Sequence, residues 1–167
     1  MRLPIRTVPL QACVSEPLKP VLDKIVVSGS LHIYISQSAR GEFVMGGATD
    51  PYALYAARSS LDFKEALTGD LLELFPFLAK ARIVRQWAGI ADMTPDFSPV
   101  MGLTPIANYY IDAGWGTWGF KATPISGKTM AATIATGVPD PLIEAFRLDR
   151  FSGFDQVGER GAASVGH

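Results

Sequence analysis

The hydrophobic positions of this chain follow two different spacings, and the first of them predicts strands. Leu31, Ile33 and Ile35 alternate with polar residues, which is typical of a strand with one buried face. Residues 28–30, Ser-Gly-Ser, interrupt that β-rich stretch, and residues 39–41 form a plausible turn into the next one. Because these strands follow one another as a meander, antiparallel pairing is expected. The expected strands are 9–15, two runs within 24–36, 42–47, 82–94 and 108–113.

The second spacing, steps of three and four, predicts helices. A first helix begins after Ser60, whose side chain can cap it, and Pro76 marks its end region. A last helix is expected over residues 124–135, with Pro124 in its first turn and Gly137 just past its end. Strands and a helix followed by strands and a helix predict an α+β fold, with an antiparallel or mixed sheet covered by helices. The apolar positions of the first helix are Phe63, Leu67, Leu71, Leu74, Phe75 and Leu78.

Composition and charge narrow the class of protein. The 167 residues include 15 basic and 16 acidic side chains, so the basic surplus of a sequence-independent nucleic-acid binder is missing. The sequence has no run of about 18 apolar residues, so no membrane span is expected. The first residues contain Pro4 and Pro9 and lack the apolar core of a signal peptide. A lone cysteine, Cys13, cannot form an internal disulfide, so we expect a reducing, cytoplasmic setting.

The stretch GWGTWGFKATPISGK, residues 114–128, carries the most distinctive chemistry. Glycines at 114, 116 and 119 lie between a predicted strand and a helix, where they permit positive φ angles and close approach of a ligand. A helix N-terminus offers unpaired N–H groups and a partial positive charge to an anion, such as the electron-rich ring of a reduced flavin. Lys121 could add a full charge. On spacing alone, a structural turn with a solvated lysine is the favoured interpretation.

Several separated motifs favour the ligand-binding interpretation instead, because they occur in the same order as in one family. They are PLQACVSEPLKP, HIYISQSARGEFVMGG, LLELFPFLAKARIVRQWAG, RQWAGIADMTPDFSPVMGLTP, GWGTWGFKATP, DPLIEAFRLDRF and GAASVGH. Together they resemble the C-terminal part of the β subunit of heterotetrameric sarcosine oxidase, within the D-amino-acid-oxidase-like, FAD-dependent amine oxidases. The resemblance covers nearly the whole chain.

This resemblance implies a reaction and a set of site residues. The reaction is oxidation of sarcosine, or of a similar secondary or tertiary amino acid, by hydride transfer to FAD. Lys121 matches the family's catalytic lysine, near the flavin and the substrate carboxylate. Thr123 and Pro124 would set the helix start that faces the pyrimidine edge of the ring. The cofactor-binding residues implied are Gly114, Gly116, Thr117, Trp118, Gly119, Phe120, Lys121, Thr123 and Pro124.

The resemblance also implies domains, and the chain departs from the family in places. Residues 1–98 match the substrate-binding part, 99–150 the last strand, turn and helix of the FAD domain, and 151–167 a tail. Family subunits are about twice as long. Their βαβ nucleotide unit, with a G-x-G-x-x-G turn after a first strand, and their FMN-attaching histidine have no counterpart in this sequence. Trp118 and Ile125 replace glycines of the family pattern.

Two functions from different classes follow. The chain is part of a split or excised flavoenzyme that needs the missing N-terminal half and the other subunits, with FMN at a subunit interface through residues absent here. Alternatively, it is a non-catalytic remnant or assembly module that cannot hold FAD alone. Under either function, the strand at 108–113 is expected to leave an unpaired edge.

Other candidate residues have a structural interpretation beside the functional one. Arg85 and Trp87 could face an active-site cavity, but an arginine stem packed along a ring is favoured. Asp92 and Asp96 could form an acid–base pair, but turn capping around a proline is favoured. His32 fits the polar face of a strand. The histidines and the cysteine have no metal-ligand spacing, so no metal is expected.

Overall fold

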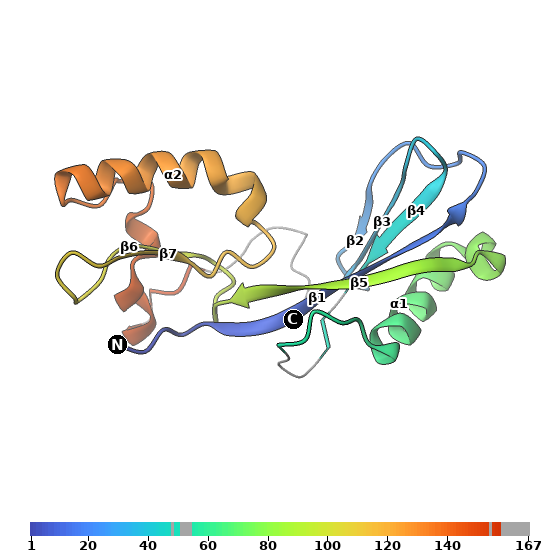
Figure 1. The fold of residues 1–167 in the computed structure, drawn as a ribbon, viewed down its shortest axis with the longest axis horizontal. Coiled ribbons are helices and arrows are strands. Elements are labelled where there is room, and N and C mark those ends of the chain that lie inside the picture. Colours follow the sequence, from blue (N-terminus) through green and yellow to red (C-terminus); the bar gives the residue numbers. More distant parts are fainter. Residues whose placement is uncertain (48, 51–54, 154, 158–167) are drawn as a thin grey trace. The chain divides into compact units, whose positions relative to one another are not determined.

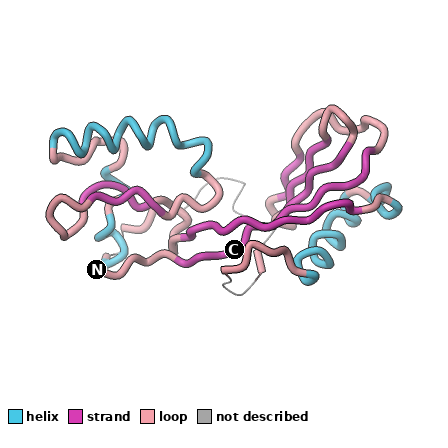
Figure 2. The backbone as a smooth tube through the Cα atoms, in the orientation of Figure 1, coloured by secondary structure: helices cyan, strands magenta, loops and turns pink. Residues whose placement is uncertain are grey.

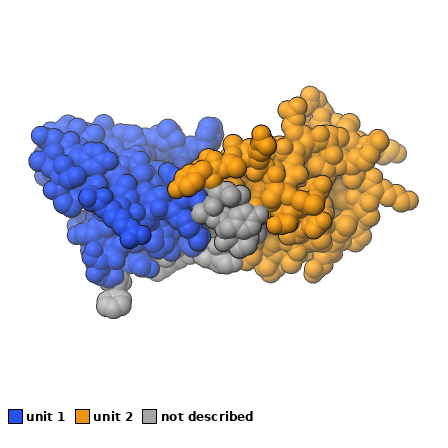
Figure 3. Space-filling model, turned by 60° about the horizontal axis from the view of Figure 1, so that its bottom comes forward, with its two compact units in different colours: residues 1–7, 91–160 blue, residues 8–90, 161–167 orange. Residues whose placement is uncertain are grey.

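The computed structural model describes residues 1–47, 49–50, 55–153 and 155–157 (Figure 1). The chain divides into two compact units (Figure 3): residues 1–7 and 91–160 form unit 1, and residues 8–90 and 161–167 form unit 2. The division at residues 98 and 99 into a substrate-binding part and a flavin-domain part stays a prediction. Among the described residues, no helix is both long and apolar enough to cross a membrane.

A five-stranded sheet runs in the order β2-β3-β4-β1-β5. The pairs β2–β3, β3–β4 and β4–β1 are antiparallel. Strand β5 also runs antiparallel to β1, since the Glu16 N–H donates to the carbonyl of Arg82 at 2.8 Å while Thr7 meets Asp92 at the other end. This confirms the predicted antiparallel meander. The strands are β1 (Arg6–Pro17), β2 (Val26–Ser28), β3 (Ile33–Gln37), β4 (Glu42–Gly46) and β5 (Ile83–Met93).

Helix α1 (Leu61–Leu74) packs its apolar face on this sheet, as its spacing predicts. Its N-cap is Ser60, whose Oγ accepts a hydrogen bond from the N–H of Phe63 at 3.1 Å. The helix is shorter than expected, because Phe75 leaves the helical conformation ahead of Pro76 and a 3₁₀ turn, η1 (Pro76–Lys80), follows. Leu74, predicted on the apolar face, is therefore exposed at the helix end.

The core of unit 2 forms where one face of the sheet meets α1. Cys13, Met45 and Ile35 are paired across β1, β4 and β3, so their side chains share a face. All three belong to a buried cluster with Phe63 and Leu67 of α1. Burial raises the pKa of the Cys13 thiol to about 11, although the charge of Lys64 acts in the opposite direction.

A buried polar network fixes the start of α1 to the sheet. The amide nitrogen of Gln11 donates to Asp50 Oδ2 at 2.8 Å, and Ser60 Oγ donates to the same carboxylate oxygen at 2.9 Å. The amide oxygen of Gln11 accepts from Ser59 Oγ at 2.6 Å, and Gln86 Nε2 donates to the Ser60 carbonyl at 2.7 Å. The network joins β1, β5 and the helix N-terminus, so it sets the position of α1 along the sheet.

Unit 1 contains a short antiparallel hairpin covered by one long helix (Figure 2). The hairpin is β6 (Val100–Leu103) and β7 (Tyr110–Ala113), and the helix is α2 (Gly119–Thr136). Buried Met130 of α2 packs with Met101 of β6 and with Ile143. The strand predicted at 108–113 therefore has a neighbour on one side. Strand β6 was not predicted, because a four-residue run containing a glycine is too short to show a period. Two 3₁₀ turns, η2 (Glu144–Phe146) and η3 (Leu148–Ser152), follow.

The limits of α2 differ from the predicted ones at one end only. The prediction of a helix start near Pro124 is wrong, because the helix begins at Gly119 and Pro124 lies inside it. The prediction at the other end is confirmed: Gly137 takes the left-handed conformation, with φ 70°, and its N–H donates to the Thr133 carbonyl.

We expect Leu67→Ala to lower the free energy of unfolding by about 2–5 kcal/mol, because Leu67 is 2% exposed in the cluster beneath α1. Leu61, on the same helix, is 59% exposed, so Leu61→Ala should cost about 0.5 kcal/mol or less. Urea unfolding of both variants measures the difference. Equal losses would show that α1 does not pack on the sheet through this face.

Candidate functional site

The turn between β7 and α2 is built on two glycines in the left-handed region. Gly114 has φ 72° and Gly116 has φ 52°, angles that side chains with a Cβ rarely adopt. The N–H of Gly116 donates to the carbonyl of Asp92 at 2.9 Å, and Trp115 forms an antiparallel bridge with Met93. The turn is thus held against the end of β5.

At both glycines a Cβ would also crowd a neighbouring side chain, which would have to move. A Cβ at Gly114 would lie 2.6 Å from Thr94 Cγ2, and one at Gly116 would lie 2.7 Å from Met93 Sδ. Atoms of Thr94 and Met93 therefore occupy the space beside these glycines, where a ligand was predicted to approach. These two glycines are therefore explained by conformation and packing, as in the structural interpretation.

Asp112, at the end of β7, fixes the turn to the helix. Its Oδ1 accepts a hydrogen bond from Trp115 Nε1 at 2.5 Å, and its Oδ2 accepts one from Ser126 Oγ. One carboxylate therefore links the strand, the turn and the second turn of α2. Neither Asp112 nor Ser126 was a predicted site residue, because no sequence spacing marks such a three-part link.

The first turn of α2 presents unpaired backbone donors. The N-cap, Trp118, makes no side-chain capping bond, and no acidic residue lies in the first turn. Helix geometry leaves the N–H groups of Gly119, Phe120 and Lys121 without an intrahelical acceptor. Phe120 is 96% exposed. Among the described residues, no side chain of the first turn or of the N-cap is bound to these N–H groups, and the nearby carboxylate of Asp112 is bound to Trp115 and Ser126 instead.

Of the predicted site residues, Thr123 and Pro124 do not lie at the helix start. The hydroxyl of Thr123 donates to the carbonyl of Gly119 at 2.9 Å, one turn earlier, and Pro124 is the sixth helical residue. The position facing an anion thus falls to Gly119, Phe120 and Lys121 instead.

Lys121 and its neighbours form the exposed rim of the turn. The Lys121 side chain is exposed, and its Nζ lies 6.0 Å from the centre of the half-buried Trp118 ring, at the limit of a cation–π contact. Thr117 is also exposed. The structure brings an ammonium group and the free N–H groups of α2 together on one short segment, residues 117–121.

Comparison with known proteins places this geometry in a family. A family model described as "FAD dependent oxidoreductase" matches residues 1–133. The chain belongs to this FAD-dependent oxidoreductase family. It is 45% identical over 99% of its length to the sarcosine oxidase subunit beta of Rhodobacter capsulatus, and 44% identical over 99% to that of an Arthrobacter species.

Solved structures agree with that assignment. L-proline dehydrogenase from P. horikoshii matches 91% of the chain with a TM-score of 0.81 and 26% identity. Glycine oxidase from Geobacillus kaustophilus matches 90% with a TM-score of 0.76 and 22% identity, which shows the fold alone. The chain spans about 40% of the length of the curated relatives it matches, and 41% of the dehydrogenase structure.

The residues of the α2 start fit the cofactor that gives this family its name. A flavin that accepts a hydride gains negative charge at one edge of its ring, and backbone N–H groups at a helix N-terminus stabilise such a charge. An acidic side chain in the first turn would oppose it, and α2 has none there.

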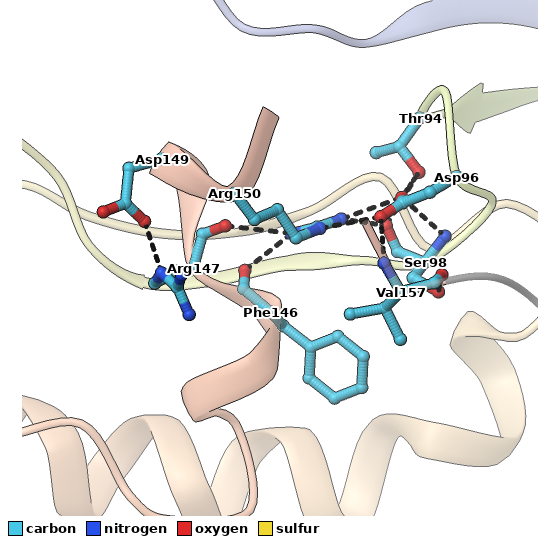
Figure 4. Close-up of polar contacts among 8 residues, drawn as sticks. All are labelled: Thr94, Asp96, Ser98, Phe146, Arg147, Asp149, Arg150 and Val157. Carbon is cyan, nitrogen blue, oxygen red and sulfur yellow. Dashed lines mark hydrogen bonds and ion pairs between the residues drawn. The ribbon is translucent and has the colours of Figure 1, made fainter. Parts of the chain in front are cut away.

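The segment beyond the family match is fixed by a buried ion pair (Figure 4). Arg150 is 0% exposed and donates from Nε and an Nη to the two oxygens of Asp96, at 2.8 and 3.0 Å. The same guanidinium donates to the carbonyls of Phe146 and Ser98, and the N–H of Val157 donates to Asp96 at 3.0 Å. Both charges are satisfied, so the pair locks η3 to the turn after β5.

This pairing decides between the interpretations of Asp96. Burial alone would raise the pKa of Asp96, but hydrogen bonds from Arg150 and the Val157 N–H outweigh it and hold the pKa below its ordinary value. Asp96 also accepts from the N–H of Ser98 at 3.3 Å, the predicted turn cap. With donors on both oxygens it is a structural carboxylate, and Arg150 is the partner that the sequence did not reveal.

Gly116→Ala should destabilise the chain by about 1–3 kcal/mol, because it combines a positive φ with a contact to Met93. Gly127 provides the matched control: it lies in α2 with nothing within 4 Å of its missing Cβ, so Gly127→Ala should stabilise by about 0.5–1 kcal/mol. Chemical unfolding of both variants tests the difference, and opposite signs are required.

We expect Asp96→Asn to lower the free energy of unfolding by about 3–5 kcal/mol at neutral pH, because it leaves the buried charge of Arg150 without its partner. The folded-state pKa of Asp96 is lowered, so its contribution is present above the ordinary value of about 3.9 and is lost as pH falls through the folded value. The difference in the free energy of unfolding between the variant and the wild type should therefore become smaller only at acidic pH.

The exposed pair of Glu16 and Arg82 supplies the control for this measurement. Arg82 is solvent-exposed, so Glu16→Gln should cost much less than Asp96→Asn at the same pH. A gap between Asp96→Asn and wild type that stays constant into strong acid would contradict the assigned pKa direction.

Proposed function

We propose that this chain forms part of a flavin-dependent sarcosine oxidase β-like subunit. The observation that carries this proposal is the 44–45% identity, over 99% of the chain, to the beta subunits of Rhodobacter capsulatus and an Arthrobacter species. A third beta subunit, from Rhizobium meliloti, is 45% identical over 96% of the chain.

The proposed substrate is a secondary or tertiary amino acid, with sarcosine as the first candidate. Sarcosine, named by the curated relatives, and L-proline, named by the matched dehydrogenase, are both secondary amines that carry a carboxylate. An ammonium group near the reacting centre suits either of them, because it pairs with the carboxylate while the amine carbon loses its hydride.

The roles of the chain's own residues follow from the geometry of the turn. When bound, FAD supplies the hydride acceptor. The N–H groups of Gly119, Phe120 and Lys121 would hold the edge of the ring that gains charge. The exposed ammonium of Lys121, on the same segment, would be the catalytic charge that pairs with the substrate carboxylate. Gly114 and Gly116 act on this site by holding the turn in shape, and Thr117 and Trp118 line its rim.

Activity in this proposal requires polypeptide that corresponds to the unmatched part of the relatives. That part supplies the nucleotide-binding half for FAD, and the other subunits of the oxidase are further partners, with FMN at a subunit interface. The cytoplasm is the proposed setting. A second candidate, an assembly module that does not bind FAD, is favoured by one observation: the G-x-G-x-x-G spacing in these 167 residues, at Gly114, Gly116 and Gly119, follows β7 and not a first strand.

We expect that joining the chain with the unmatched part of the Rhodobacter capsulatus subunit gives a complex with visible flavin absorbance. Within that complex, Lys121→Met should lower kcat/KM for sarcosine by about 100-fold, because the removed charge acts on the flavin and on the carboxylate. Steady-state kinetics of both proteins measure the loss.

Lys128→Met is the control, since Lys128 is another exposed lysine of α2, two turns farther along. It should leave kcat/KM within about twofold. A complex without flavin absorbance would refute the enzymatic proposal in favour of the assembly module. Equal activities of the two lysine variants would remove Lys121 from the mechanism.

A further inference from the structure

Strand β5 leaves one long side of the five-stranded sheet open. It is the last strand in the order β2-β3-β4-β1-β5 and has 11 residues. Among the described residues, β1 is the strand that pairs with it, and the turn at Trp115 and Gly116 meets it only at Asp92 and Met93. The outward N–H and C=O groups before that point therefore have no strand neighbour in the described part of the chain.

The side chains of β5 do not protect this edge. Natural edges are made short, or carry lysine or proline, to prevent pairing with other chains. Residues 83–91 contain neither and carry a single charge, at Arg85, whereas Val84, Trp87 and Ile90 are exposed apolar residues. The opposite edge differs: β2 has only three residues and follows the charged pair Asp23 and Lys24. The β2 edge of the sheet is therefore protected against pairing with another strand, and the β5 edge is not.

The length of the relatives indicates what covers the open edge. The matched L-proline dehydrogenase aligns with 91% of this chain, yet that alignment covers only 41% of the dehydrogenase. The beta subunits likewise extend well beyond the matched 40%. A chain of that size holds more than enough residues to supply another strand.

We propose that the outer edge of β5 pairs with a β-strand from the polypeptide that corresponds to the unmatched part of the relatives. This inference rests on the proposed function. The incoming strand is extended, carries apolar residues where it meets Trp87 and Ile90, and carries an acidic residue near Arg85. Arg85 is exposed, makes no ion pair with a described residue, and is the single charged residue between Ile83 and Ala91. Backbone pairing supplies affinity and these side chains supply register.

Hydrogen exchange of the full chain, alone and mixed with the unmatched part of the Rhodobacter capsulatus subunit, tests this pairing. The β5 amides should exchange at least about tenfold more slowly in the mixture, while the β2 amides change little. Unchanged β5 amides, or no complex at all, would overturn the inference. Protection of β5 in the chain alone, through a dimer of this chain, would also overturn it.

A pair of matched variants gives a second measurement. Ile90 on β5 is 48% exposed and Val27 on β2 is 49% exposed, so both tolerate a polar replacement in the isolated chain. Ile90→Asp should weaken the complex by about tenfold or more, because it removes buried apolar area from the interface. Val27→Asp should change the dissociation constant less than about threefold. Equal effects at the two edges would contradict the assignment to β5.

Flavin absorbance separates failure of this inference from failure of the proposed function. A complex with protected β5 amides but no flavin would refute the flavoenzyme and keep the strand pairing. A complex with bound flavin and unprotected β5 amides would keep the flavoenzyme and refute the pairing.

Discussion

The left-handed backbone at Gly114 and Gly116 is the constraint on which the candidate site depends. It brings the chain from β7 back against Thr94 and Met93, so close that a Cβ at either glycine would force a neighbouring side chain to move. Asp112 then ties that turn to α2 through Trp115 and Ser126. The start of α2 is thereby placed by interactions inside unit 1. A site formed in advance loses less entropy when its cofactor binds.

Periodicity predicted the elements that have a long apolar face. Alternation at Leu31, Ile33 and Ile35 predicted a strand, and steps of three and four from Phe63 predicted α1, because one buried face imposes a period on the sequence. The strand begins only at Ile33, and the prediction that His32 lies on its polar face is wrong, because His32 belongs to the preceding turn with φ 52°. Strand β6 was not predicted, because its four residues, which include Gly102, are too few to show a hydrophobic period. The start of α2 was misplaced because Pro124 is tolerated inside the second turn, whereas proline in general favours a first turn.

The candidate site was predictable in its location and less so in its contacts. Glycines ahead of a helix indicated the turn, and the role of Lys121 that the resemblance implies stays a prediction. Which glycines serve packing could not be read from the sequence, because their neighbours Met93 and Thr94 come from another strand. The same holds for Asp112 with Ser126 and for Asp96 with Arg150. Pairs that meet only after folding have no spacing rule, so their partners remain hidden in a single sequence.

The enclosed pair of Asp96 and Arg150 has a consequence for how this protein can vary. Losing either partner leaves an isolated charge away from water, which is far costlier than replacing both together with apolar residues of similar volume. Drift through single substitutions is therefore blocked at these two positions. Over a lineage they should covary, and a homologue that has exchanged one should have exchanged the other as well.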